Sequence, residues 1–506
     1  MKLPLAGILK EGRRASAQRF WPRAIVSPEL WSMAGRLLAD GRLVLLALWG
    51  EANAVHMALL SEEPLEIAVI TLECADGRFP SVGETHPAAI RCERAIRDLH
   101  GLEPVGTPDQ RPWLDHGRWG LRHPLGKPKK APAAGAPYVF LPVEGESLHQ
   151  IPVGPVHAGI IEPGHFRFTA NGETVVRLEE RLGYVHKGTE SLMAGSDLAR
   201  AAKLAGRVSG DSTVAYATAF AHAVEAACDV KVPRRAVWLR ALMAELERLA
   251  NHFGDFGAIC NDASFSLMHA QCGMLRERIL RAAASCFGHR LMMDRVIPGG
   301  VAADLQLDGA RHVKSLLAEI AARLPKLVEL YDSTASLQDR TVATGILNPA
   351  LARRFGAGGY VGRASGRAFD ARRAIGYAPY DELKFDVPVL EDGDVNARVW
   401  IRLREIEQSI TLIEQILTGL PDGPIAVDSV AAGKNAAEGL GIVEGFRGDI
   451  LVWVRLDGSG RIARCHLRDP SWFQWPLLEA VIEGNIVADF PLCNKSFNCS
   501  YSGHDI

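Results

Sequence analysis

The stretch GPVHAGIIEPGHFRFTANGETVVRLEERLGYVHKGTE, residues 154–190, decides the fold of the larger part of this chain. Its middle, HFRFTANGETVVRLEE, and the run YVFLPV at 138–143 are rich in β-type residues, which predicts strands. Beyond residue 190, apolar side chains recur at the spacing of an amphipathic helix. Long helices are therefore expected at about 192–228, 234–256, 263–292, 309–338 and 395–418.

Outward from this stretch, residues 123–137 separate two regions of different character. HPLGKPKKAPAAGAP contains four prolines and three lysines without a hydrophobic period, which is typical of an interdomain linker. Before it, residues 24–122 alternate short β-type runs with helical ones. Toward the C-terminus, the alternating runs at 450–468 are joined by DGSG and predict a hairpin. We expect an α+β protein with a small α+β domain over 1–122, a linker, and a large, mainly helical domain with peripheral β hairpins over 138–506.

Composition and charge exclude several classes of protein. Of the 506 residues, 48% are hydrophobic and 23% charged, which is typical of a globular protein with a large core. A net charge of -2 provides no basic field, so nucleic acid is not expected as a partner. The most apolar run, LVLLALWG at 43–50, is shorter than the roughly 20 residues that cross a bilayer. No secretory signal precedes it, and the chain is expected to be cytoplasmic.

Common motifs for metals and nucleotides are not found. The nine cysteines form no CxxC pair, so we expect free, buried thiols that bind no iron–sulfur cluster of their own. GAGGYVG at 356–362 lacks GxGxxG spacing and follows a helical run, so it is expected to open no helix and to bind no nucleotide. Walker A, HExxH and GxSxG sequences are absent.

Histidine and glutamate gather around the glycines of GPVHAGIIEPGHFRF. His157, Glu162 and His165 could carry protons or bind a polar ligand, because imidazoles and carboxylates titrate near neutral pH once burial shifts them. Alternatively, each imidazole satisfies a backbone group of a tight turn. The residue types leave both interpretations open.

Several motifs occur in the order found in one family. The opening stretch, and later RVIPGGVAADL, QDRTVATGIL, GRASGRAFDARR and YDELKFDVPV, resemble the large subunit of membrane-bound, energy-converting nickel–iron hydrogenases of the formate hydrogenlyase type. They equally resemble the quinone-site subunit of respiratory complex I, a homologue of it. RCERAIRDLHGLEPVGTPDQRPWL at 91–114 is similar to the small peripheral-arm subunit of complex I, which this hydrogenase group fuses ahead of the large subunit. The resemblance covers nearly the whole chain.

The resemblance implies a metal site that this sequence does not supply. The family holds nickel and iron with four thiolates from two cysteine pairs. The residues at the expected cysteine positions are Ser209 and Ser212 in RVSGDS, and Ser500 and Gly503 in CSYSGHDI. Hydroxyls are poor ligands for such a cluster and glycine supplies none, so we expect no nickel–iron centre and no hydrogen turnover through it. Cys499 lies one residue from an expected position, and the sequence ends at Ile506 without the extension that nickel hydrogenases lose after metal insertion, as expected of a chain that needs no such processing.

Other residues match family positions around the former active site, where Glu162 corresponds to a proton-passing glutamate. The candidate catalytic residues are Glu162, His157, His165, Arg207, Asp370, Arg447 and Asp505. Tyr184, in GYVHKG, is a candidate for lining a quinone cavity. The resemblance implies that a metal-free polar cavity binds a quinone headgroup, as in complex I, although the two histidines stand further apart than in its motif. A structural salt-bridge network is the alternative.

These expectations favour a peripheral-arm subunit of a membrane-bound, hydrogenase-related or complex I-like complex on the cytoplasmic face of the inner membrane. Its partners would be an iron–sulfur small subunit and antiporter-like membrane subunits, and it would serve redox- or proton-coupled ion translocation. A second hypothesis is a quinone-reactive, NADH-dehydrogenase-like subunit that receives electrons from the partner's iron–sulfur cluster. A third is a non-catalytic structural adaptor.

Overall fold

The N-terminal region is a sheet with helices on one face. The computed structural model describes residues 4–15, 18–130, 137–157, 161–430 and 436–506. The sheet has the order β1 (Arg13–Arg14), β3 (Arg23–Ile25), β6 (Leu65–Glu73), β5 (Ala54–Glu62), β4 (Val44–Gly50), with only β3 and β6 parallel among these pairs. Its helices are α1 (Pro4–Glu11), α2 (Pro28–Ala39) and α3 (Ile90–His100). Helix α2 begins where Ser27 accepts the Leu30 N–H, and α3 ends at Gly101, whose φ is 74°.

A second sheet covers the opposite face of the first. Its order is β18 (Ile462–Arg468), β17 (Gly448–Leu456), β16 (Ala437–Gly445), β2 (Gln18–Arg19), so the N-terminal region contributes one strand to it. Trp49 of β4 packs against Trp453 of β17, with ring centroids 5.6 Å apart. Because aromatic and aliphatic side chains of both sheets share this buried cluster, the two regions form one continuous core.

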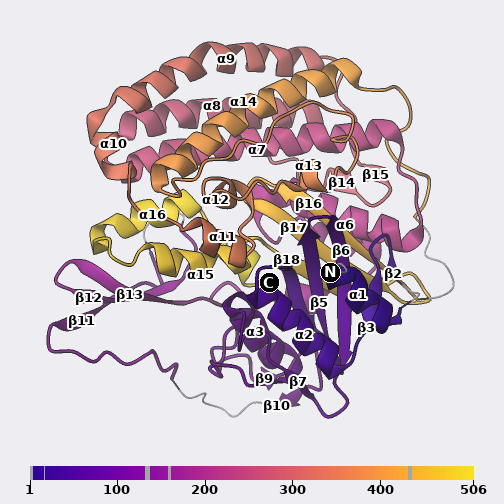
Figure 1. Cartoon of the computed structure of the whole chain (residues 1–506). Coiled ribbons are helices and arrows are strands. Elements are labelled where there is room, and N and C mark those ends of the chain that lie inside the picture. Colours follow the sequence, from indigo (N-terminus) through magenta and orange to yellow (C-terminus); the bar gives the residue numbers. More distant parts are fainter. Residues whose placement is uncertain (1–3, 16–17, 131–136, 158–160, 431–435) are drawn as a thin grey trace.

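Helices cover the other face of the second sheet. Helix α6 (Thr213–Cys228) lies directly on β16, where a Cβ on Gly439 would come within 1.9 Å of the Ala223 carbonyl oxygen, so only glycine permits this approach. Beyond it, Figure 1 shows the long helices stacked in a bundle. These helices are α7 (Arg234–Asp262), α8 (Ser266–Phe287), α9 (Gly309–Ser333) and α14 (Val395–Gly419).

A small sheet and the C-terminal helices flank the central sheet. The small sheet, β11 (Leu148–Val153), β12 (His165–Asn171) and β13 (Thr174–Arg181), projects from the body in Figure 1. The C-terminal helices are α15 (Ser471–Val481), α16 (Phe490–Phe497) and α17 (Tyr501–His504). The remaining short elements are β7 (Arg78–Pro80), β8 (Glu103–Val105), β9 (Leu121–Arg122), β10 (Lys129–Lys130), β14 (Val296–Ile297), β15 (Gly300–Val301), α4 (Thr189–Met193), α5 (Leu198–Ala205), α10 (Ala335–Thr341), α11 (Pro349–Arg354), α12 (Gly359–Arg363), α13 (Ala371–Ala374), η1 (Pro87–Ala89), η2 (Gly210–Ser212) and η3 (Val487–Asp489).

The predicted α+β class, with a mainly helical second region, is confirmed. The helix expected over 192–228 is wrong, because the chain turns at Gly195, with φ 75°, and again between α5 and α6. The expectation that GAGGYVG opens no helix is also wrong: α12 begins at Gly359, where a Cβ would lie 2.1 Å from the Arg447 carbonyl oxygen. Part of the expected linker, 131–136, lies outside the described residues, and the domain boundaries stay a prediction.

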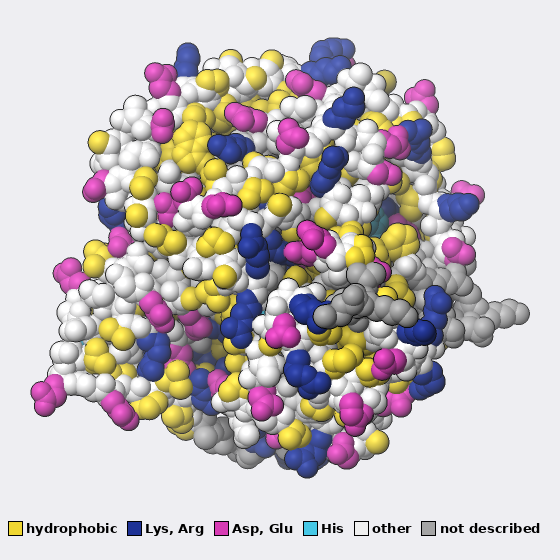
Figure 2. Space-filling view, in the orientation of Figure 1, with side chains coloured by type: hydrophobic (Ala, Val, Ile, Leu, Met, Phe, Trp, Pro, Cys, Tyr) yellow, Lys and Arg dark blue, Asp and Glu magenta, His cyan; other side chains and the backbone are white. Residues whose placement is uncertain are grey.

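Two further findings concern the whole described chain. None of the nine cysteines forms a disulfide, and eight of them are buried. Within the described ranges, no helix combines the length and the apolar character needed to cross a membrane. Figure 2 shows acidic and basic side chains interspersed over the visible face.

Candidate functional site

The positions expected to carry cysteines lie together in the fold. Ser209 stands before η2, and Ser500 is the N-cap of α17. Their Oγ atoms are 3.0 Å apart, and the Gly503 N–H donates to Ser500 Oγ at 2.9 Å. The loop between α5 and α6 therefore meets the C-terminal segment through direct hydroxyl contacts.

An ion pair completes this arrangement. Arg447 Nη2 lies 2.6 Å from Asp211 Oδ2, and Arg447 Nη1 donates to Asp211 Oδ1 at 2.9 Å. The same Oδ1 accepts from Ser209 Oγ at 2.7 Å and from Ser212 Oγ at 3.2 Å. Burial disfavours the charged carboxylate, yet Arg447 and the two hydroxyls hold the pKa of Asp211 well below its usual range. We call Ser209, Asp211, Ser212, Arg447 and Ser500 the serine–arginine cluster.

A buried aspartate closes the fourth position. A Cβ placed on Gly503 would lie 2.5 Å from Asp469 Oδ2 and 2.9 Å from Ser500 Oγ. Asp469 is held in place, because Tyr216 OH donates to its Oδ2 at 2.7 Å and the Ser471 N–H donates to its Oδ1 at 2.8 Å. A side chain at position 503 would therefore need the space that the Asp469 carboxylate occupies.

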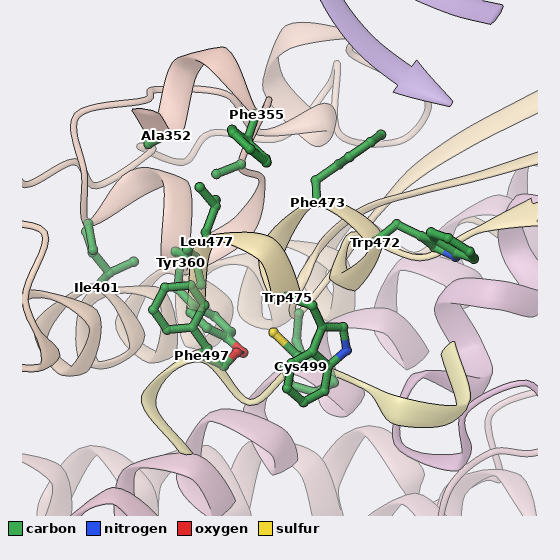
Figure 3. Packing of buried hydrophobic residues seen from close by; sticks show 14 of the residues in the cluster. Ala352, Phe355, Tyr360, Ile401, Trp472, Phe473, Trp475, Leu477, Phe497 and Cys499 are labelled. Carbon is green, nitrogen blue, oxygen red and sulfur yellow. The ribbon is translucent and has the colours of Figure 1, made fainter. Parts of the chain in front are cut away.

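Cys499 belongs to the apolar core. Figure 3 shows its sulfur beside Trp475, in the group of aromatic side chains that includes Tyr360. Its Sγ lies 3.9 Å from Gln474 Oε1, and burial is the main reason that its pKa is well above the usual value for a thiol. This environment disfavours the thiolate that binds metals.

The histidines of the opening stretch bind the backbone of their own turn. His157 Nε2 lies 2.9 Å from the Gly164 carbonyl oxygen, and His165 Nδ1 lies 3.2 Å from that of Gly154. Glu162 instead reaches the C-terminal segment, where its Oε2 accepts the Ser502 N–H at 3.1 Å. Glu162 is thus the member of this group that is connected to the region of the serine–arginine cluster.

Two other candidate residues occupy structural positions. Arg207 points away from the cluster and forms a bidentate pair with Asp294, at 2.6 and 2.7 Å. Asp505 is fully buried, and its Oδ2 accepts the Gly183 and Val185 N–H groups at 2.9 and 3.1 Å. The hydrogen bonds to Asp505 therefore hold the segment after β13 against the C-terminal residues.

Asp370 and Tyr184 also lie apart from the cluster. Asp370 caps α13 and binds Arg372 at 2.7 Å within a buried charge network; despite burial, the arginine lowers its pKa to about 2. Tyr184 is 38% exposed, and its ring packs on His116 with centroids 4.4 Å apart. Among the described residues, no hydrogen bond joins either side chain to the serine–arginine cluster.

The two aspartates that hold this site together were not among the candidate residues. Asp211 could have been chosen because it lies between the two serines of RVSGDS, whereas Asp469 lies in RDPSWF, which matches no motif. In the described part of the chain, no group of three or more His, Cys, Asp or Glu side chains is arranged to hold a metal ion.

Comparison with known proteins assigns both regions. The 49 Kd subunit of respiratory-chain NADH dehydrogenase matches residues 265–438 and 430–505, and the 30 Kd subunit matches 28–134. Formate hydrogenlyase subunit 5 of Escherichia coli K12 is 32% identical over 437 residues, which cover 84% of this chain and 77% of that protein. The chain belongs to this family of fused 30 and 49 kDa complex I-type subunits.

Other members of the family extend the comparison. Hydrogenase-4 component G of the same organism is 33% identical over 464 residues, which cover 89% of this chain and 80% of that protein. Among solved structures, a chain of the membrane-bound sulfane sulfur reductase, an archaeal respiratory membrane complex, matches with a TM-score of 0.68 and 26% identity. That match covers 72% of this chain and all of the other. The family resemblance predicted from the motifs is confirmed.

Proposed function

We propose that the protein is a peripheral-arm subunit of a membrane-bound, complex I-like or hydrogenase-related oxidoreductase complex, and that it holds no nickel–iron centre. In this proposal it sits on the cytoplasmic face of the inner membrane, docks to an iron–sulfur small subunit and couples to antiporter-like membrane subunits. The complex would use redox or proton transfer to drive ion translocation.

The observation that carries the proposal is the serine–arginine cluster. Nickel and iron in this family need soft thiolates, and the side chains here are hydroxyls. The Ser209 and Ser500 hydroxyls hydrogen-bond directly to one another, and Asp469 fills the space beside Gly503. Two hydroxyls in direct contact and a filled fourth position do not fit a nickel–iron centre.

The cluster also supports an explanation of how the fold is held together in this region without metals. In the metal-bearing relatives, metals would tie the first ligand loop to the C-terminal segment. Here the Ser209–Ser500 contact joins the same two segments directly, and Arg447 bridges them by binding Asp211 on one side and the Asn498 carbonyl oxygen, at 2.5 Å, on the other. The ion pair and hydrogen bonds therefore replace a metal cross-link.

Elemental analysis tests the proposal. The purified complex should contain far less than one nickel per chain, and a variant with cysteine at positions 209, 212, 500 and 503 should not regain it, because Asp469 still blocks the fourth position. One nickel per chain in the natural complex would overturn the proposal. Iron content, measured in parallel, reports whether the iron–sulfur partner is present.

A quinone-reactive subunit is the second candidate function. Val156 is 84% exposed and Ile161 53% exposed, and they are the sequence neighbours of His157 and Glu162. Apolar and titratable side chains together suit a ligand with an apolar ring and polar oxygens. We expect Glu162→Gln and His157→Ala to slow quinone reduction by the complex without unfolding the protein.

The matched control is Glu173→Gln, since Glu173 is exposed in the turn between β12 and β13. Unchanged turnover in both site variants would exclude this candidate. If the complex also showed no saturable quinone binding, the chain would be assigned as a non-catalytic adaptor.

A further inference from the structure

A buried glutamate and a partly exposed one share an arginine at the boundary between the two family regions. Arg91 of α3 lies 3.0 Å from Glu180 Oε2, on β13, and its other Nη lies 2.7 Å from Glu479 Oε1, on α15. The Glu180 N–H also donates to Glu479 Oε1 at 2.8 Å. The Glu180 side chain has no exposed surface, and Arg91 is 7% exposed.

Arg91 carries one positive charge, whereas the two glutamates carry two negative charges when both are ionised. One bound proton would balance these charges. The other arginine of α3 that faces the pair, Arg94, is bound to Asp109 at 2.9 Å and to two backbone carbonyl oxygens. On β13, Glu179 is paired with Arg111 at 2.5 Å. Other titratable groups that act on the pair or on Arg91 are Cys92, Tyr138, Cys499, Tyr501 and His504. Arg91 therefore serves two carboxylates alone.

One oxygen of the pair has no partner. Glu180 Oε1 is buried and accepts no hydrogen bond within the described structure. A buried carboxylate oxygen without a donor is costly, and a bound proton removes that cost. Burial first, and then repulsion from Glu479, raise the pKa of Glu180 well above its usual value despite Arg91.

The pair reaches solvent through Glu479. The Glu479 side chain is 25% exposed, so it can exchange protons with solvent.

We propose that Glu180 and Glu479 bind one proton between them at Arg91, and that this proton exchanges with solvent through Glu479. The evidence for proton binding is the excess of negative charge around Arg91 and the unpartnered Oε1 of Glu180. Use of this proton in turnover rests on the function proposed above.

Infrared difference spectroscopy of the full chain tests proton binding. At neutral pH the carbonyl stretch of a protonated carboxyl should disappear in Glu180→Gln. The matched control is Glu225→Gln, because Glu225 is also buried but has its own arginine, Arg240, at 2.6 Å. The control should lose no such band. An unchanged spectrum in Glu180→Gln would overturn the proposal.

Thermal stability provides a second, independent readout. Since a neutral glutamine resembles a protonated glutamate, Glu180→Gln should keep the wild-type unfolding temperature at neutral pH, whereas Glu225→Gln should lower it. A comparable loss in both variants would show that Glu180 is charged and would refute proton binding. These measurements need no turnover, so their failure is distinguishable from failure of the proposed function.

Discussion

Gly503→Ala should destabilise the protein even though it adds a single methyl group. The new Cβ would lie 2.5 Å from Asp469 Oδ2, 2.7 Å from its Cγ and 2.9 Å from Ser500 Oγ, all closer than van der Waals contact. Asp469 cannot turn away without losing the hydrogen bonds from Tyr216 OH and the Ser471 N–H. Overpacking of this kind costs about 1–3 kcal/mol.

Part of that cost is offset, because alanine favours a helix over glycine by up to about 1 kcal/mol. A net loss of about 1–2 kcal/mol should lower the unfolding temperature by a few degrees, since about 2–4 °C per kcal/mol holds for domains of 150–250 residues and larger proteins shift less. Differential scanning calorimetry at neutral pH measures the change.

Gly273→Ala is the matched control. Gly273 lies within α8, is exposed, and has no atom within 4 Å of an added Cβ. This variant should therefore be as stable as the natural protein or slightly more stable. If Gly503→Ala behaved like Gly273→Ala, the space at position 503 would be open and the argument that Asp469 closes a ligand position would be refuted.

Three further variants test the charge pairs and the core. Arg447→Ala leaves Asp211, whose side chain is 32% exposed, without its cation and should cost about 1–3 kcal/mol, measured by thermal unfolding; an intact unfolding temperature would show that the ion pair is not needed. Glu190→Gln removes a carboxylate whose pKa, despite burial, Arg464 and a neighbouring histidine hold at about 2. Because this folded pKa is below the unfolded value of about 4.3, the charge stabilises the fold above that pH, and the contribution is lost as the pH falls through about 2. The unfolding temperatures of the variant and the natural protein should therefore converge in acid. A constant difference between them would contradict the pairing. Trp49→Ala should cost about 3–5 kcal/mol through the cavity left between the two sheets, and a chemical unfolding midpoint within error of the natural one would show that the sheets do not depend on this contact.

The sequence predicted elements whose pattern matches their environment. Helix α7 keeps its helical period and was expected over most of its length, and the hairpin of β17 and β18 was expected from DGSG. Strand β5 was missed, although its equally buried neighbours β4 and β6 were expected as β-type runs, because its alanine, methionine and leucine residues favour a helix.

The candidate site was predictable only where a residue carries a family motif. Ser209 and Ser500 meet as the motifs implied, although the contact spans the chain. Arg207 belongs to the same motif, yet its guanidinium turns to Asp294 at the surface, which no linear pattern specifies. Asp469 became visible as a site residue only when the fold placed it against Gly503.

The strand β2 has a consequence for the order in which this protein is made. It pairs with β16, and nearby Arg23 binds Glu438, which follows it by 415 residues. During synthesis, the first-made sheet must wait for almost the whole polypeptide before its outer face is covered. Such distant pairing slows folding and leaves apolar strands open to aggregation. Nascent chains of this protein should therefore depend on chaperones until residues beyond β17 have left the ribosome.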